Sequence, residues 1–192
     1  MKNELNARIH FYLTCLLAFL LPILPVVIPP VIALLLLNWI AGWNFLKLFK
    51  KQNNRMYFLL FASLYLLYLA GMLWSENTEY GLNDLETKLS LLLFPLIYFS
   101  SEPLDKKKLS NVFLSLTWGC LTASVICLGY AIFQYFQVRY LLAHNIWAWD
   151  YGINFFLKDR LSFLIHPSYI SMYFIIALAG LHWLKPVWPT SF

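Results

Sequence analysis

Residues 158–173 of the 192-residue chain read KDRLSFLIHPSYISMY, a charged cluster followed by an apolar run. Arg160 lies in the cluster, and His166 directly precedes Pro167, where the apolar run begins. Proline suits the first position of a helix, because the N–H of that position has no partner within the helix in any case. The stretch therefore predicts a hydrophobic helix whose N-terminal end lies beside charged side chains.

The composition predicts that such helices make up most of the chain. Hydrophobic residues account for 61% of the sequence and charged residues for 12%, whereas soluble domains carry about 45–50% and about 25%. We therefore expect an all-α, polytopic membrane protein with one membrane domain over residues 1–192, surrounded by membrane lipids. Cys15, Cys120 and Cys127 lie in apolar runs without metal-binding spacing, so we expect no metal site, no cofactor and no disulfide.

The apolar runs predict about six transmembrane helices. Their expected ranges are 9–28, 31–46, 56–73, 83–100, 109–137 and 167–184. No cleavage site follows the first run, which favours a retained helix over a signal peptide. The run from Leu89 to Phe99 covers only about half of a 30 Å hydrocarbon layer. We therefore expect its helix to begin near Asn83, with Asn83 as the cap and with Asp84 and Lys88 paired four residues apart.

The distribution of positive charge predicts how these helices cross the membrane. With the N-terminus inside, the inner segments hold ten of the 14 basic residues: Lys2, Arg8, Lys47, Lys50, Lys51, Arg55, Lys106, Lys107, Lys108 and Lys185. The outer segments hold only Lys88, Arg139, Lys158 and Arg160. This asymmetry places both termini in the cytoplasm and the loops 75–88 and 138–166 outside. It also explains the net positive charge without a nucleic-acid partner.

The end of the second outer loop is the first candidate site. Helix N-termini carry unpaired N–H groups and partial positive charge. Ser168 adds a hydroxyl, and Arg160 and Lys158 add cations, so the segment is typical of a phosphate or diphosphate site at a membrane surface. His166 would bind the anion or transfer a proton. The alternative is that Lys158 and Arg160 are interfacial anchors that pair with Asp159, and that His166 only caps the helix.

The acidic loop 75–88 is the second candidate. Glu79, Asn83 and Glu86 share one face if the segment is helical. That face would orient a sugar or pair with Arg160 or Lys158; the alternative is a solvated interfacial turn. No charged residue falls at the middle of an expected membrane helix, which disfavours an ion-coupled transporter.

At these two loops the sequence resembles the bacterial O-antigen ligase family and the related O-antigen polymerases. The first similar segment runs from WSEN at residues 74–77 through Gly81 to LETKLSLLLFPL at residues 85–96. The second runs from Arg160 to HPSY at residues 166–169 and is similar to an external Arg-x-x-Gly-x-x-x-(His/Asn)-Pro pattern. Phe163 stands where that pattern often has glycine.

The resemblance implies a multi-pass glycosyltransferase of the bacterial inner membrane that acts in lipopolysaccharide biosynthesis. Such an enzyme moves a glycan from undecaprenyl diphosphate to an acceptor such as lipid A–core on the periplasmic face, without a metal. Arg160 would bind the diphosphate, with Lys158 and Ser168 beside it, and His166 and Glu86 are the weaker catalytic candidates. Family members continue with further helices and a large external loop. The chain is therefore expected to be an N-terminal half or fragment, inactive without the remaining half. A non-enzymatic scaffold or accessory subunit is the alternative function, and a small transporter is a further one.

Overall fold

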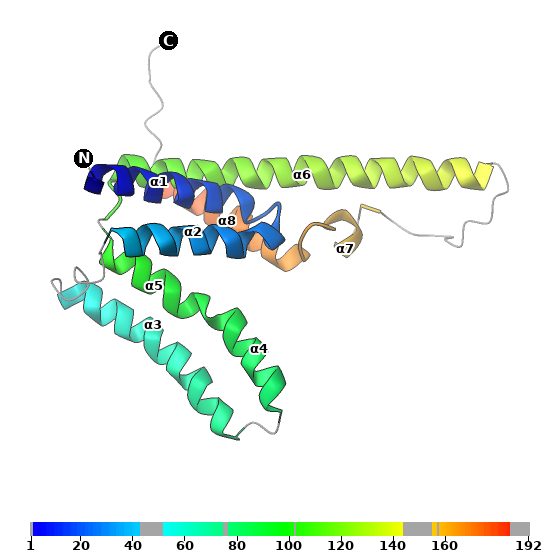
Figure 1. The fold of residues 1–192 in the computed structure, drawn as a ribbon. Coiled ribbons are helices and arrows are strands. Elements are labelled where there is room, and N and C mark those ends of the chain that lie inside the picture. Colours follow the sequence, from blue (N-terminus) through cyan, green and yellow to red (C-terminus); the bar gives the residue numbers. More distant parts are fainter. Residues whose placement is uncertain are drawn as a thin grey trace, which may run out of the picture. The chain divides into compact units, whose positions relative to one another are not determined.

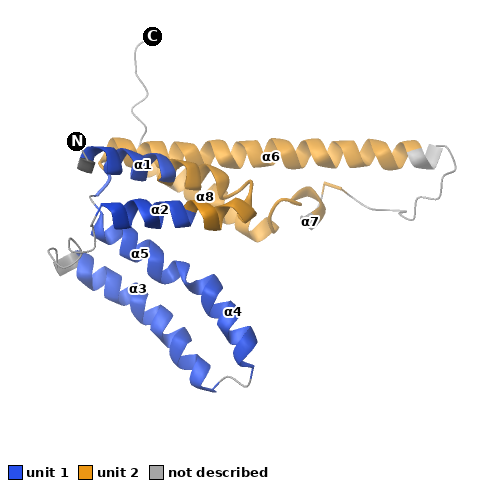
Figure 2. Ribbon diagram, viewed as in Figure 1, with its two compact units in different colours: residues 1–13, 32–104 blue, residues 14–31, 105–192 orange. Residues whose placement is uncertain are grey.

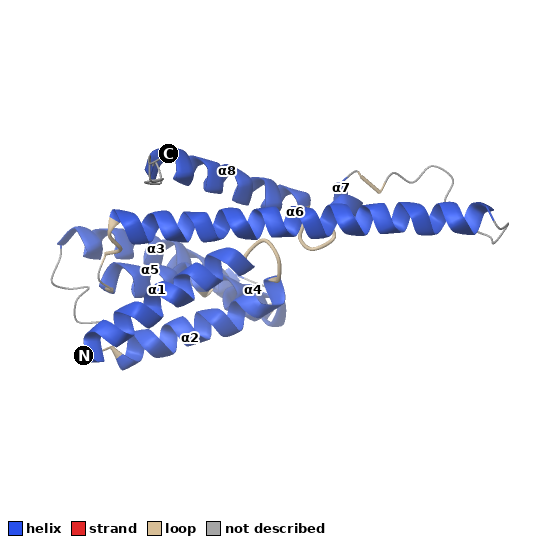
Figure 3. Cartoon of the chain, turned by 90° about the horizontal axis from the view of Figure 1, so that it is seen from above, coloured by secondary structure: helices blue, strands red, loops and turns tan. Residues whose placement is uncertain are grey.

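The computed structural model describes residues 2–42, 52–74, 77–101, 103–143, 155–156 and 158–184. Within these ranges all regular structure is helical and no strand occurs (Figures 1 and 3), so the all-α prediction is confirmed. The chain divides into two compact units (Figure 2): residues 1–13 with 32–104, and residues 14–31 with 105–192. Each unit is described by itself.

The N-terminal segment forms two helices separated by a short 3-10 turn. α1 (Lys2–Leu20) is followed by η1 (Pro25–Val27) and α2 (Ile28–Ala41). The predicted range 9–28 was wrong at both ends, since α1 begins already at Lys2 and ends at Leu20. Its early end follows from Pro22 and Pro25, because proline has no N–H to continue a helix. α2 begins before the predicted residue 31, since its two prolines lie in the first turn, where no N–H partner is needed. The predicted end of this helix, with Trp43, lies outside the described residues.

The next three helices lie in unit 1. α3 (Gln52–Gly71) continues into η3 (Met72–Trp74), and α4 (Thr78–Lys88) and α5 (Ser90–Ser100) follow. The predicted outer loop 75–88 is therefore mostly helix, and the predicted start near Asn83 was wrong. Asn77 caps α4 instead, since its Oδ1 accepts a hydrogen bond of 3.0 Å from the N–H of Tyr80. Asn83 lies in the middle of α4.

Unit 1 has a polar contact within its buried core. Leu35 and Ile97 are fully buried there. Beside them the indole Nε1–H of Trp39 donates to the hydroxyl of Ser100 over 2.5 Å, and this hydroxyl donates to the carbonyl of Leu96 over 2.5 Å. Because a buried polar group is costly unless it is hydrogen-bonded, this chain of bonds fixes α2 against the end of α5.

Replacing Ser100 with alanine is expected to lower the free energy of unfolding by about 1–3 kcal/mol, since it removes the acceptor from a buried indole N–H. Unfolding by a denaturing detergent in mixed micelles measures this change. Ser63→Ala is the control, because Ser63 is exposed and donates only to its own helix, at Leu60. Equal stabilities of the two variants would contradict this role for the Trp39–Ser100 bond.

Unit 2 is built on one long helix. α6 (Lys106–Ala143) has 38 residues, or about 57 Å, and exceeds the predicted 109–137 at both ends. Asp105 explains its early start, since a carboxylate oxygen of Asp105 accepts the N–H of Lys108 over 2.9 Å. α7 (Lys158–Leu161) is a single turn, and α8 (Pro167–Leu184) has the bounds that the sequence predicts.

α6 and α8 pack closely in unit 2. A small core joins Ala18 of α1, Leu116 and Cys120 of α6, and Ala177 of α8. Two segments of the described chain, Asn54–Trp74 and Lys106–Tyr140, are long and apolar enough to cross a membrane. The first corresponds to the predicted helix 56–73 and the second contains the predicted helix 109–137.

Candidate functional site

The N-terminal end of α8 begins with a cap that the sequence predicts. The His166 carbonyl accepts hydrogen bonds from the N–H groups of Tyr169 (3.0 Å) and Ile170 (3.3 Å). The His166 ring also takes part, because its Nδ1 accepts the N–H of Ser168 over 3.3 Å. Pro167 has no N–H. The expectation of unpaired backbone donors at this end was therefore wrong for Ser168 and Tyr169, since His166 accepts hydrogen bonds from both.

The state of the His166 ring follows from this bond. A neutral imidazole has one N–H and one acceptor nitrogen. Because Nδ1 accepts from Ser168, we assign the ring proton of the neutral form to Nε2. The ring N–H of His166 is then at Nε2, and both His166 and Ser168 are exposed. The geometry favours the anion-binding role for His166 over the role of proton acceptor.

Arg160 lies just before this end, in α7. Its guanidinium is exposed and lies 5.8 Å from the centre of the Phe155 ring. The connection to α8 is tightened by Ser162, whose hydroxyl donates to the carbonyl of Ile165 over 2.5 Å. α7 therefore presents a cation a few residues before the positive end of the α8 dipole, and both features favour a negatively charged ligand.

Contacts between α6 and the α7–α8 segment set the register of this site. Near the far end of α8, Gly180 lies against the Phe113 ring, and Ala177 packs with Leu116 and Cys120. Just before α8, the Phe163 ring packs against Tyr130 at a centroid distance of 4.3 Å. The helices are therefore antiparallel, and Phe163, four residues before the start of α8, lies level with Tyr130 of α6. Phe163 makes the last of these contacts.

Lys158 and Glu86 complete the predicted set. Lys158 is the first residue of α7, and its side chain lies outside what the structure describes. Glu86 lies on α4 in unit 1, where it is exposed. Pairing of Glu86 with Arg160 or Lys158 remains a prediction. Lys47, Lys50, Lys51 and Lys185, which the sequence assigns to the inner side, lie outside the described residues.

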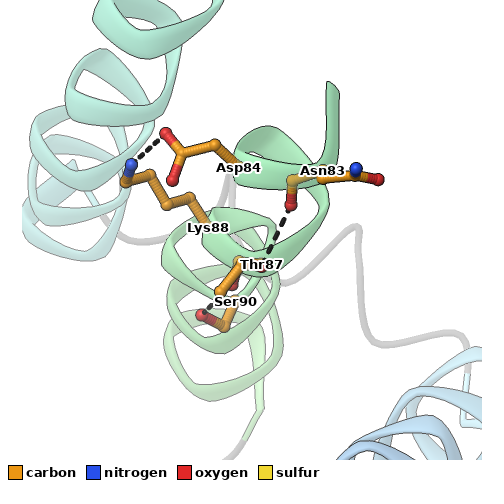
Figure 4. A network of polar contacts seen from close by, with 5 residues as sticks. All are labelled: Asn83, Asp84, Thr87, Lys88 and Ser90. Carbon is orange, nitrogen blue, oxygen red and sulfur yellow. Dashed lines mark hydrogen bonds and ion pairs between the residues drawn. The ribbon is translucent and has the colours of Figure 1, made fainter. Parts of the chain in front are cut away.

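α4 carries a polar network at its C-terminal end (Figure 4). Lys88 forms the predicted ion pair with Asp84, and its ammonium lies 4.2 Å from the centre of the Tyr68 ring on α3. On the same turns Thr87 donates to the carbonyl of Asn83 over 3.0 Å, and Ser90 donates to the carbonyl of Thr87. Lys88 thereby joins α4 to α3.

Glu79, Asn83 and Glu86 all lie on α4 and are exposed, so the segment is helical, which is the condition under which they share one face. A role of this face in orienting a sugar remains a prediction. Among the described residues, no group of three or more His, Cys, Asp or Glu side chains is placed to hold a metal ion.

Comparison of the chain with protein-family models, with curated proteins and with solved structures found no match. The resemblance described above therefore remains a prediction from two sequence segments.

Proposed function

We propose that the chain is part of a membrane glycosyltransferase that transfers a glycan from undecaprenyl diphosphate to an acceptor such as lipid A–core. The reaction would take place at the periplasmic face of a bacterial inner membrane, with six spans and cytoplasmic termini. The observation that carries the proposal is the capped start of α8, where His166 and Ser168 are exposed and Arg160 lies one short turn earlier. The family resemblance supplies the reaction class.

The register of α6 and α8 supports the membrane placement. A hydrocarbon layer of about 30 Å takes about 20 helical residues. Counted from the basic residues 106–108, which suit the inner surface, this length ends near Gly129 of α6. The Phe163–Tyr130 contact brings the residues just before α8 close to this level. This register supports the proposal that the start of α8 lies near the outer surface.

The chemistry requires a stabilised leaving group. An acceptor hydroxyl would attack the anomeric carbon of the glycan, a new C–O bond would form, and the bond to the carrier diphosphate would break. The diphosphate departs with the electron pair, and the hydroxyl proton passes to a base. Arg160 would neutralise the departing diphosphate with a planar pair of donors. The Nε2–H of His166 and the hydroxyl of Ser168 would add hydrogen bonds to it.

Arg160→Ala is expected to weaken binding of undecaprenyl diphosphate by about ten-fold or more, because hydrogen bonds to charged groups contribute about 1.5–3 kcal/mol. Binding is measured on the chain in lipid nanodiscs. Arg139→Ala is a matched control: Arg139 is also exposed and also lies 5.8 Å from an aromatic centre, that of Tyr135. Its removal is expected to change the affinity less than three-fold.

Two comparisons decide the outcome. Undecaprenol, which lacks phosphate, should bind equally to the wild type and to Arg160→Ala. In membranes that carry the complete gene product, Arg160→Ala should also reduce glycan transfer in proportion to the loss of binding. Equal affinity of the two arginine variants for the diphosphate, or undiminished transfer, would remove Arg160 from the assigned role. If the complete gene product bound undecaprenyl diphosphate but transferred no glycan, the alternative function as a non-enzymatic scaffold would be favoured.

A further inference from the structure

Unit 1 contains a cavity of about 310 Å³ between α3 and α5. One side is formed by Phe61 of α3. The other side is formed by a single face of α5, with Ser90, Leu91, Phe94, Pro95, Tyr98 and Phe99. The lining is almost entirely apolar, and four of its seven side chains are aromatic rings. Such a cavity suits a hydrocarbon ligand and offers few partners to a sugar or a nucleotide.

The cavity is elongated along α5. Its lining residues recur at intervals of four, from Ser90 and Leu91 to Tyr98 and Phe99, so they follow one helix face over about 13 Å. An extended hydrocarbon chain can lie along a groove of this length and this apolar lining. The groove therefore runs along the helix axis, as the acyl chains of a bilayer run along a helix that crosses it.

Contacts close the helix pair at both ends of the groove. At one end the side-chain amide of Asn54 donates to the carbonyl of Phe99 over 2.8 Å, and the Phe61 and Phe99 rings lie 6.1 Å apart. Beyond the other end, Lys88 lies over the Tyr68 ring. α3 and the α4–α5 segment are thus joined above and below the groove, so the space between them is built into the fold.

The α3 side of the groove belongs to a helix that is mostly exposed. Only 6% of the most apolar window of Asn54–Trp74 is buried inside the structure. In a membrane such a surface contacts lipid. Lys88 lies two residues before Ser90, the first lining residue of α5, so a cation stands at one end of the groove. An ammonium has three donors and can bind a phosphate oxygen while it stays paired with Asp84.

We propose that this groove binds one acyl chain of an anionic membrane phospholipid, with the phosphate beside Lys88 and the chain directed from Ser90 toward Phe99. The proposal rests on the membrane insertion inferred above but not on glycan transfer. The apolar lining selects the chain, and the position of Lys88 sets its direction.

The test places the protein in phosphatidylglycerol vesicles that contain a trace of phosphatidylglycerol with a photoactivatable diazirine on one acyl chain. Labelled residues are mapped by mass spectrometry after irradiation. A diazirine near the ester is expected to label residues near Ser90, and one near the methyl end is expected to label residues near Phe99. This ordered map is obtained on the wild-type protein, so it does not depend on any variant folding.

A matched pair of variants tests occupancy. Leu91→Trp places a larger ring in the groove and is expected to reduce labelling of residues 90–99 about five-fold or more. Leu92→Trp makes the same change at a neighbouring position of α5 that does not line the groove, and its labelling is expected to stay at the wild-type level. Equal labelling in both variants would overturn the proposal, as would a map without order along α5.

The remaining outcomes distinguish lipid binding in the groove from insertion of the protein into the membrane. Labelling of the exposed residues Leu66 and Leu67 on α3 without labelling of residues 90–99 would contradict the groove alone. Absence of labelling on both would contradict membrane insertion as well. Loss of the labelled band on addition of equimolar undecaprenyl phosphate would assign the groove to an isoprenoid chain and overturn the acyl-chain assignment.

Discussion

Gly119→Ala is expected to lower the free energy of unfolding of unit 2 by about 1–3 kcal/mol or more, as overpacking of a close helix contact does. A Cβ at this position would lie 2.2 Å from the carbonyl oxygen of Phe19 and 3.0 Å from a ring carbon of Pro22. The nearest atom belongs to the backbone of α1 and cannot turn aside as a side chain does. α1 and α6 would have to separate, and the core of Ala18 and Cys120 would open.

The matched control for this prediction is Gly129→Ala on the same helix. No atom lies within 4 Å of a Cβ at Gly129, so this change removes only the conformational freedom of glycine and should stabilise the helix by up to about 1 kcal/mol. Denaturation in mixed micelles measures both variants. Opposite signs are expected; a loss at Gly129 as large as that at Gly119 would show that helix propensity, and not the contact with Phe19, governs the result.

Gly180→Ala is the second change with a large expected effect. A Cβ at Gly180 would lie 2.0 Å from Cδ1 and 2.4 Å from Cε1 of the Phe113 ring. The ring must move out of its site between α6 and α8, with a cost of about 1–3 kcal/mol from overpacking. This contact lies on α8, the helix whose opposite end carries His166, so the same change is expected to weaken the capped start of α8.

A double-mutant cycle isolates this contact. Phe113→Leu alone removes ring volume and should be destabilising, whereas Gly180→Ala in the Phe113→Leu background should cost less than in the wild type. The expected coupling free energy is about 1 kcal/mol or more in the compensating direction. Additive losses would contradict the direct clash and place the cost of Gly180→Ala elsewhere in α8.

Strong local signals predicted several features correctly. The bounds of α8 followed from Pro167 and the apolar run behind it, and the ion pair between Asp84 and Lys88 followed from their spacing. The first half of α4, residues 78–82, was assigned to a loop because its composition is polar, which is typical of a connection. Its cap at Asn77 was the available sign of a helix, since asparagine is a preferred N-cap residue.

The site was predicted less completely, because its geometry depends on contacts between distant residues. Arg160, His166 and Ser168 follow one another in the sequence, so their proximity to the start of α8 was foreseen. The packing of Phe163 on Tyr130 was not, since 32 residues separate them and no periodicity connects the two. The bond from Ser168 to the His166 ring depends on a side-chain rotamer, which a sequence pattern does not specify.

The length of α6 has a geometric consequence for any orientation in a bilayer. Transmembrane helices tilt by up to about 40°, and at this tilt a hydrocarbon layer of about 30 Å takes up about 26 residues. Lys106–Tyr140 has 35 residues. About nine or more of them must therefore lie outside the hydrocarbon at every permitted tilt. In the proposed orientation the basic residues 106–108 hold the inner end at the cytoplasmic surface, so the excess emerges on the opposite side. The C-terminal end of α6 then lies in water, at a distance from the lipid that the rigidity of a single helix determines.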